Sequence, residues 1–521
     1  MTDTNQFDVV VIGAGHNGLV SAAYLAESGL KVLVLESSGT IGGAARTCEF
    51  SEGYRVSECA HLVYALHPTI VRDLKLTNYG LRYAATDLGT ISLGSDGLHV
   101  LIKGDSVSGD ISYEDADSYR KFRSKMIKFC QVFATTLEHQ PPRLMNGSLG
   151  DKLSLLKLGW QVRKLGKTDM QELLRIGSIN IYDVLEERFD NQLLKGALCL
   201  DAVLGSHTGP RSPNTVLAYL YRHVGETFGF NGPSIPLGGM GTVVEAIAAS
   251  AKSSGAELRT SSKVEKILTE GSKVVGVRLE TGEEIKTHTV VSNADPRATF
   301  SSLVGYPQLD TEFSRRVHNI RMKGNTAKLH LALDSRPRFT GVGESETGNR
   351  LVIAPDSDYV ERAFNHAKYK EYSDKPIVEI SIPSIHDSTL APAGKHVLSA
   401  VVQYAPHNLQ QGWSQASDTF KNLLIDLIED YAPGIRQQIV ASELLTPADI
   451  ESRFGTTNGH WHHGELALDQ FLMLRPFPGM SQYATPVHGL YHCSAGSHPG
   501  GNVLGMVGRN CARAVIKRGD R

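Results

Sequence analysis

The hydrophobic pattern of the first forty residues predicts a strand, a helix and a second strand in close succession. Residues 9–12 are four consecutive apolar residues, which is typical of a strand buried on both faces. Apolar side chains then recur with helical spacing over residues 19–26, and a second apolar run follows at 32–35. This order of elements, with a short first turn, indicates the start of a parallel sheet.

Three glycines fill the turn between the first strand and the helix, and each has a physical task in a dinucleotide site. Gly13 allows a tight turn, Gly15 lets the backbone approach a pyrophosphate, and Gly18 lets the helix pack on the strand. The helix N-terminus offers free N–H groups and a partial positive charge to phosphates. Glu36, at the end of the second strand, can accept both hydroxyls of an adenosine ribose and repels a 2′-phosphate. We therefore predict a dinucleotide site that does not take NADP.

A second glycine-rich segment follows almost at once and favours FAD over NAD. It starts at Ser37, and its adjacent glycines Gly42 and Gly43 precede Arg46. Such a loop can fold over a bound cofactor and place a guanidinium near its phosphates. A domain that binds only NAD has no need of this second clamp.

Later patterns predict that distant segments complete the same sheet. An apolar helix over 243–248 follows glycines at 238–241, which we interpret as a helix N-terminus rather than a second phosphate site because no strong strand precedes them. The remaining patterns predict strands at 263–267, 274–279, 289–296, 327–333 and 376–382, a hairpin turn at 280–283, helices at 119–136 and 181–200, and a C-terminal segment at 490–516.

We predict an α/β protein of two domains, each assembled from separate stretches of the chain. The dinucleotide-binding domain comprises residues 1–68, 231–299 and 481–521 and is of the Rossmann type. The substrate domain is α+β and comprises residues 69–230 and 300–480. The length of 521 residues agrees with two domains, since it exceeds what one core usually supports.

Composition narrows the classes of function. The chain is 41% hydrophobic and 21% charged, with a net charge of −2, which gives no electrostatic case for binding nucleic acid. Its six cysteines contain no C-x-x-C pair, so a redox-active dithiol is disfavoured. No signal peptide precedes the first strand and no stretch resembles a membrane span, so we expect a cytoplasmic protein.

Taken together, the motifs resemble those of the phytoene desaturase-related FAD-dependent oxidoreductases in the flavin amine oxidase superfamily. The segments that carry the resemblance are residues 11–20, 41–45, 238–241, 292–296 and 490–510. Within that family the chain is most similar to the group named pyridine nucleotide-disulfide oxidoreductase domain-containing protein 2. For eukaryotic relatives, the resemblance implies a location in the mitochondrial matrix and a partner in the respiratory chain.

The resemblance also implies which residues contact FAD. Val264 is expected to meet the adenine through its backbone, and Gly496 to lie by the pyrophosphate. Residues 500–503 are expected to run under the flavin ring, where their N–H groups can stabilise negative charge near N1. The full set is Gly13, Ala14, Gly15, His16, Asn17, Gly18, Glu36, Ser37, Gly42, Gly43, Ala44, Ala45, Arg46, Val264, Ala294, Gly496, Gly501, Asn502 and Val503.

Histidines near the C-terminus are the candidates for catalysis. His463 fits the family motif and can serve as a base, and His498 precedes the segment expected under the flavin. We expect His460 and His462 to share a face of a strand and line the substrate cavity, with packing as the alternative. A metal site is disfavoured because no further ligands are evident. The alternative role of His498 is to brace its loop by hydrogen bonding.

These observations leave three hypotheses for function. The first is an FAD-dependent oxidoreductase that dehydrogenates C–H bonds of a lipophilic or unsaturated small molecule by hydride transfer to flavin N5. The second keeps FAD but assigns amine oxidation or redox-neutral double-bond isomerisation. The third is a flavin-containing regulatory protein that binds a respiratory-chain partner. A homo-oligomer is compatible with all three.

A basic amphipathic stretch at residues 154–176 bears on the access of substrate. Its apolar and basic residues could touch a membrane and admit a lipophilic molecule. The alternative is a solvated helix face that covers the substrate domain.

Overall fold

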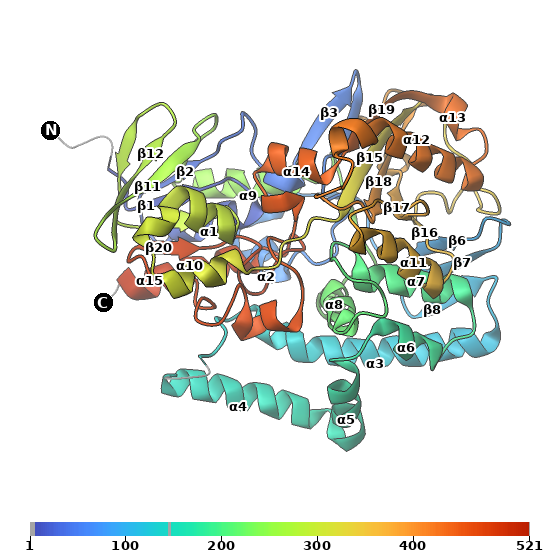
Figure 1. The fold of residues 1–521 in the computed structure, drawn as a ribbon, viewed down its shortest axis with the longest axis horizontal. Coiled ribbons are helices and arrows are strands. Elements are labelled where there is room, and N and C mark those ends of the chain that lie inside the picture. Colours follow the sequence, from blue (N-terminus) through green and yellow to red (C-terminus); the bar gives the residue numbers. More distant parts are fainter. Residues whose placement is uncertain (1–5, 144–146, 520–521) are drawn as a thin grey trace.

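Five parallel strands form a sheet at the centre of one half of the molecule. In the computed structural model, which describes residues 6–143 and 147–519, these strands lie in the order β10–β2–β1–β14–β20. Their bounds are β1 Val9–Ile12, β2 Val32–Leu35, β10 Glu257–Arg259, β14 Val290–Ser292 and β20 Leu490–His492. The sheet therefore draws on segments from both ends and the middle of the chain (Figure 1).

Apolar layers cover this sheet on both faces, which explains its continuous apolar strands. Val9 and Val11 pack into a core with helices α1 (His16–Glu27), α9 (Gly241–Ser253) and α15 (Met506–Gly519). Their neighbours Val10 and Ile12 face the opposite core. That core includes the antiparallel sheet of β11 Val264–Glu270, β12 Lys273–Leu279 and β13 Glu284–Lys286.

A larger, mostly antiparallel sheet forms the other half. Its eight strands follow the order β19–β15–β18–β17–β16–β6–β7–β8. Their bounds are β6 Thr90–Leu93, β7 His99–Lys103, β8 Ser106–Gly109, β15 Thr326–Leu333, β16 Arg350–Ile353, β17 Ile377–Ser381, β18 His396–Gln403 and β19 Ile439–Leu445. One face packs on α12 (Trp413–Tyr431) and the other on α7 (Gln192–Val203) and α11 (Ser357–Lys368).

The remaining elements connect or cover the two sheets. Two small antiparallel sheets pair β3 with β4 in a hairpin and β5 with the distant β9. The bounds are β3 Thr47–Ser51, β4 Tyr54–Ser57, β5 Tyr83–Ala85, β9 Ile235–Pro236, α2 Pro68–Asp73, α3 Tyr113–Leu137, α4 Leu149–Lys164, α5 Gly166–Ile176, α6 Ile181–Glu186, α8 Thr215–Arg222, α10 Thr311–His318, α13 Ile435–Gln438 and α14 Pro447–Phe454. Over the described residues, no helix has the length and apolarity needed to cross a bilayer.

The predicted α/β class with a Rossmann-type sheet is confirmed, but two local predictions are wrong. The helix predicted over 181–200 is two helices, α6 and α7, because residues 187–191 turn. Asp115 holds that turn by accepting the backbone N–H groups of Asp190 and Asn191, at 3.0 and 2.8 Å. Residues 460–464 form turns instead of the expected strand. The domain boundaries stay a prediction.

Candidate functional site

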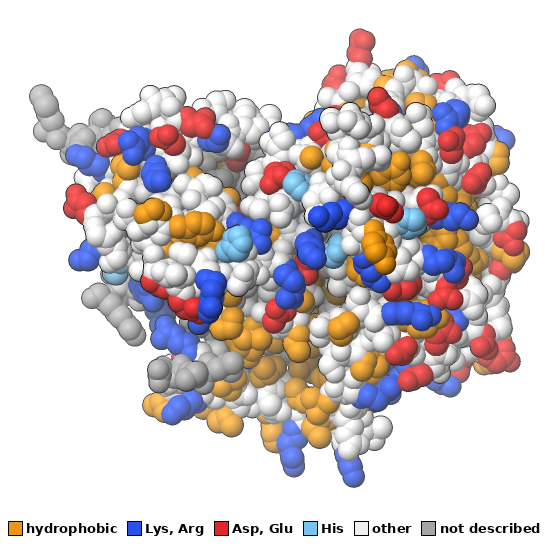
Figure 2. Space-filling view, in the orientation of Figure 1, with side chains coloured by type: hydrophobic (Ala, Val, Ile, Leu, Met, Phe, Trp, Pro, Cys, Tyr) orange, Lys and Arg blue, Asp and Glu red, His pale blue; other side chains and the backbone are white. Residues whose placement is uncertain are grey.

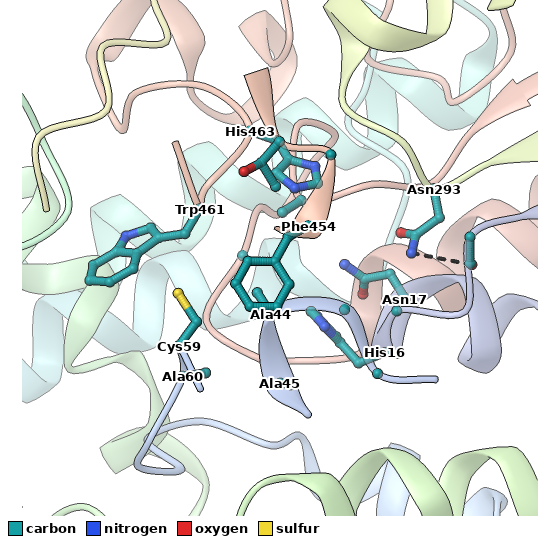
Figure 3. Close-up of a pocket in the computed structure, with 18 of the residues that line it drawn as sticks. His16, Asn17, Ala44, Ala45, Cys59, Ala60, Asn293, Phe454, Trp461 and His463 are labelled. Carbon is teal, nitrogen blue, oxygen red and sulfur yellow. Dashed lines mark hydrogen bonds between the residues drawn. The ribbon is translucent and has the colours of Figure 1, made fainter. Parts of the chain in front are cut away.

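A cavity of about 430 Å³ begins at the carboxyl ends of β1 and β2 and extends to the eight-stranded sheet. Gly13, Gly15 and Glu36 line it at the first end, and Glu379 and Val401 line it at the other. This placement follows from the parallel sheet, because the carboxyl ends of its strands meet at one edge. Figure 3 shows residues from both ends of the chain around this cavity.

The turn after β1 and the start of α1 require glycine at three positions. Gly13 has a φ of +92°, and the amide of Asn293 donates to its carbonyl oxygen at 3.4 Å. A Cβ at Gly15 would lie 2.7 Å from Nδ2 of Asn293, and one at Gly18 would lie 2.2 Å from the oxygen of Gly13. The glycines therefore let α1 approach both β1 and the loop after β14.

The first turn of α1 is electrostatically open to an anion. Gly15 caps the helix without a side-chain hydrogen bond, and no acidic residue occupies the first turn. Free N–H groups and the positive end of the helix dipole therefore face the cavity near Gly15 and His16. This arrangement suits a phosphate or diphosphate.

Glu36 joins the loop that follows β1 to the loop that follows β2. The backbone N–H of Ala14 donates to its Oε2 at 2.8 Å, and the backbone N–H of Ser38 donates to its Oε1 at 2.8 Å. Each carboxylate oxygen keeps further lone-pair capacity, and Glu36 lines the cavity. The carboxylate can thus fix its own loops and still accept hydroxyl groups from a sugar.

The glycine-rich loop that follows β2 folds against the turn that follows β1. The backbone N–H of Gly42 donates to the oxygen of Ala14 at 2.9 Å, which holds the loop over the start of α1. Arg46 pairs with Glu58 and donates to Oγ of Ser38 at 3.2 Å. Because the guanidinium is fixed in this way and lines the cavity, its remaining N–H groups are positioned for an anion.

The C-terminal segment closes the cavity from the other side. Asn502 and Val503 line it with φ values of +70° and +49°. The hydroxyl of Tyr221 donates to the oxygen of Gly501 at 3.1 Å and anchors this segment to α8. A left-handed conformation at the β-branched Val503 is uncommon and is typical of functional sites. Asparagine tolerates this conformation better than most residues other than glycine, which suits Asn502 to its position.

Buried polar atoms without partners follow the length of the cavity. Within residues 6–143 and 147–519, no hydrogen bond reaches Nε2 of His16, Oδ1 of Asn17, Nδ1 of His463 or Nδ2 of Asn502. All four residues line the cavity. Buried polar groups rarely stay unpaired, so these atoms fit a long polar ligand that runs from α1 to the C-terminal segment.

Most residues predicted from the sequence come together at this cavity. Those that line it are Gly13, Gly15, His16, Asn17, Glu36, Ser37, Gly42, Gly43, Ala44, Ala45, Arg46, Val264, Ala294, His462, His463, Gly501, Asn502 and Val503. Ala14 and Gly18 lie behind the lining, where they shape the first turn. Gly496 also lies outside the lining. It packs closely on Pro296, because a Cβ at position 496 would lie 2.7 Å from that ring.

Two of the predicted histidines lie outside the lining. Nε2 of His498 is 3.0 Å from the backbone oxygen of Thr136, so this side chain braces the C-terminal segment against α3. His460 is buried with its ring centroid 6.2 Å from that of His462. Over the described part of the chain, no group of three or more His, Cys, Asp or Glu residues could hold a metal ion.

A charged network at the inner end of the cavity was not predicted from the sequence. Oε2 of Glu379 on β17 accepts from Nε of Arg350 at 2.7 Å, Nη2 of Arg222 at 2.5 Å and the hydroxyl of Tyr64 at 3.1 Å. Its other oxygen, Oε1, lies 2.9 Å from Nε2 of His61. The two arginines hold the pKa of Glu379 well below its usual range, despite burial.

This network orients His61 toward the cavity. Burial, together with the charge of nearby Lys328, lowers the pKa of His61 to about 4, so the ring is neutral at pH 7. Nε2–H then donates to Glu379, which leaves Nδ1 as the acceptor. Nδ1 is buried without a partner among the described residues, and His61 lines the cavity.

Lys328 lies close to this network and is fully buried on β15. Its Nζ has no hydrogen-bond partner within the described residues, and burial lowers its pKa to about 7. An amine of this kind gains and loses a proton near neutral pH. The sequence contains a signal for this network, because Lys328 and Glu379 are charged residues inside apolar strands. Burying a charge there costs free energy, so such a residue is a candidate for a functional site.

Comparison with known proteins relates this sequence to a family of flavin enzymes. The model of the family described as flavin-containing amine oxidoreductase matches residues 18–487. The chain is 34% identical to pyridine nucleotide-disulfide oxidoreductase domain-containing protein 2 of Mus musculus, across 98% of this chain and 94% of the relative. It is 27% identical to one subunit of the limonene dehydrogenase of Castellaniella defragrans, across 99% of this chain and 96% of the relative.

The fold is also similar to that of a solved flavin-family structure. Cyclohexylamine oxidase from Brevibacterium oxydans superposes with a TM-score of 0.60 over 99% of this chain and 100% of that chain. The identity of 15% means that this likeness shows the fold alone. The family and the fold predicted from the motifs are confirmed.

We expect Lys328→Met to stabilise the protein at neutral pH. The folded pKa lies below the ordinary 10.5, so the unfolded chain binds more protons between pH 7 and pH 10, and stability rises with pH across that window. The variant should raise the free energy of unfolding at pH 7 by about 1–3 kcal/mol and flatten this rise. Urea unfolding at pH 7 and pH 9 measures both effects. Exposed Lys395→Met is the control, and an unchanged pH slope would contradict the assignment.

Proposed function

This chain belongs to the flavin-containing amine oxidoreductase family, and we propose that it binds FAD in this cavity and dehydrogenates a lipophilic or unsaturated small molecule. The observation that carries the proposal is the continuity of the cavity. One continuous cavity joins the glycine turn and Glu36 to a chamber around Leu204 and Val401. A cofactor held at the first end can therefore meet a substrate held at the second.

Three segments of the chain divide the task of holding FAD. The start of α1 and Glu36 suit the diphosphate and the ribose, Arg46 adds a cation, and residues 501–503 close over the ring end. When bound, a flavin takes up a hydride from a C–H bond and passes the electrons to an acceptor such as oxygen or a quinone. The unpaired atoms of His16, Asn17 and Asn502 support this placement.

The inner chamber supports an apolar substrate. Leu62, Leu204, Val401 and Trp461 give it apolar surface. Of the charged groups at its inner end, Glu379 and Arg222 are paired with each other. The relative from Castellaniella defragrans is named for limonene, an unsaturated hydrocarbon, and covers nearly the whole of this chain. These apolar walls would align an apolar molecule beside the segment 501–503.

Two histidines are the candidates to hold a proton in the chamber. Nδ1 of His61 is oriented by Glu379, and Nδ1 of His463 has no partner among the described residues. His498 lies outside the lining, and its contact with Thr136 supports the bracing role instead. We propose His61 as the main proton acceptor because a carboxylate fixes its tautomer.

Amine oxidation is the second candidate, and the family supports it. A carboxylate in the chamber, Glu379, could also attract an ammonium group. Two arginines, Tyr64 and His61 already occupy this carboxylate, however, so little of its charge is left for a substrate. Dehydrogenation of a C–H bond therefore stays the first proposal.

Anaerobic mixing of the flavin-loaded protein with candidate substrates tests the reaction class. We expect apolar alkenes to bleach the visible flavin absorbance and simple alkylamines to leave it unchanged. Bleaching by amines alone would favour the second candidate. Product formation without bleaching and without consumption of an acceptor would instead indicate an isomerase.

Glu36→Ala should weaken FAD binding by about tenfold to a hundredfold, because a buried carboxylate that accepts hydrogen bonds is lost. Calorimetric titration of the flavin-free protein with FAD measures the change. Glu52→Ala is the matched control, since Glu52 is exposed in the β3–β4 turn. Equal affinities for the two variants would place the ribose elsewhere.

His61→Asn should lower kcat by about a hundredfold or more while the flavin content stays unchanged, since it removes a positioned proton acceptor. The exposed His488→Asn should match the wild-type protein. A larger loss in His463→Asn than in His61→Asn would transfer the role to His463. Single-turnover flavin reduction is the measurement, because it reports the C–H step directly.

A further inference from the structure

Helix α4 is the most weakly embedded long helix of the described chain. It lies along the lower edge of the molecule beneath α3 and continues through Leu165 into α5 (Figure 1). None of its residues is fully buried. Its inner side nevertheless has a defined contact, because Leu158 and Val162 pack against the helical core below the eight-stranded sheet.

The outer side of α4 carries a second apolar stripe that the fold leaves uncovered. Leu149, Leu153, Leu156 and Trp160 are 79%, 65%, 69% and 57% exposed. Their spacing of four, three and four residues places them on one face of a helix. Large apolar side chains rarely gather on a free surface without a partner.

Basic side chains border this stripe on both sides. With about 100° of rotation per residue, Lys152 and Arg163 fall on one flank, and Lys157 and Lys164 fall on the other. The one acidic residue of α4, Asp151, instead caps the helix by pairing with Ser148. No described carboxylate forms an ion pair with any of the four basic residues. Figure 2 shows orange and blue side chains together along this lower edge.

We propose that α4 is a docking helix for the surface of an anionic lipid bilayer. The stripe supplies apolar insertion at the level of the headgroups, and the flanking lysines and arginine meet lipid phosphates. Trp160 suits that depth, because its ring is apolar and its N–H is polar. The contact is peripheral, since α4 has its inner side against the protein.

Charge selects the lipid surface over a second copy of the chain. A symmetric dimer through this stripe would bring the four basic residues of one copy toward the same four of the other. An anionic bilayer instead presents opposite charge over the whole length of the helix. Each basic residue near such a surface strengthens binding by about fivefold, so four unpaired ones provide a strong preference for acidic lipid.

Vesicle flotation tests the proposal with the full-length, flavin-loaded protein. We expect binding to vesicles of equal phosphatidylcholine and phosphatidylglycerol to exceed binding to phosphatidylcholine alone by at least about tenfold, and high salt to reduce it. Leu153→Gln/Leu156→Gln should lose at least about tenfold in affinity for the mixed vesicles. Lys157→Glu/Lys164→Glu should lose the preference for the acidic lipid.

Matched control variants separate docking through α4 from nonspecific adsorption to vesicles. Leu98→Gln/Leu468→Gln changes two leucines that are 48% and 53% exposed elsewhere, and Lys103→Glu/Lys395→Glu makes the same charge change away from α4. Both controls should float like the wild-type protein, and all variants should keep their flavin content and melting temperature. Because flotation does not depend on turnover, this result is independent of the proposed reaction.

Three outcomes would overturn the proposal. The first is a wild-type protein that does not float with acidic vesicles. The second is equal flotation by the α4 variants and their controls. The third is a change of oligomeric state in Leu153→Gln/Leu156→Gln by light scattering, which would identify a second copy as the occupant of the stripe.

Discussion

The parallel sheet is the constraint on which the rest of the molecule depends. Parallel strands cannot be joined by tight turns, so each neighbour follows only after a crossover, which is the single helix α1 between β1 and β2. Here β14 and β20 enter beside β1 after long excursions. The segments between these strands build the other half of the molecule. The loops after β14 and β20 then bring residues 293–295 and 501–503 to the edge of the sheet where the glycine turn of β1 lies. The cavity is a consequence of this topology.

Two buried carboxylates define the two ends of that cavity in different ways. Glu36 accepts two backbone N–H groups and keeps further lone pairs that line the cavity, where we propose that they meet the ribose of the cofactor. Glu379 is surrounded by arginines, and its charge serves the protein itself by fixing His61. A buried charge that is compensated within the protein stabilises an arrangement, whereas one with spare capacity recognises a ligand.

The sequence predicted what local patterns encode. The strand Val9–Ile12 and the spacing to Glu36 depend on neighbours within a few turns of chain, and the dinucleotide end followed from them. The pairing of His61 with Glu379 joins residues 318 positions apart, so no local pattern contains it. The break at 187–191 was missed for the same reason, since its N–H groups are satisfied by Asp115 on another helix.

Helix α3 connects the outer surface of the molecule to the segment that closes the cavity. Its C-terminal end supplies backbone oxygens to His498 and, at 2.8 Å, to the amide of Asn510. These two contacts lie on either side of residues 501–503, which line the cavity. Helix α4 follows α3 along the chain and lies beneath it, so the outer helix and the cavity both contact α3. The outer stripe is therefore linked to the cavity through α3 by two kinds of contact: apolar packing of Leu158 and Val162 on one side, and hydrogen bonds from His498 and Asn510 on the other.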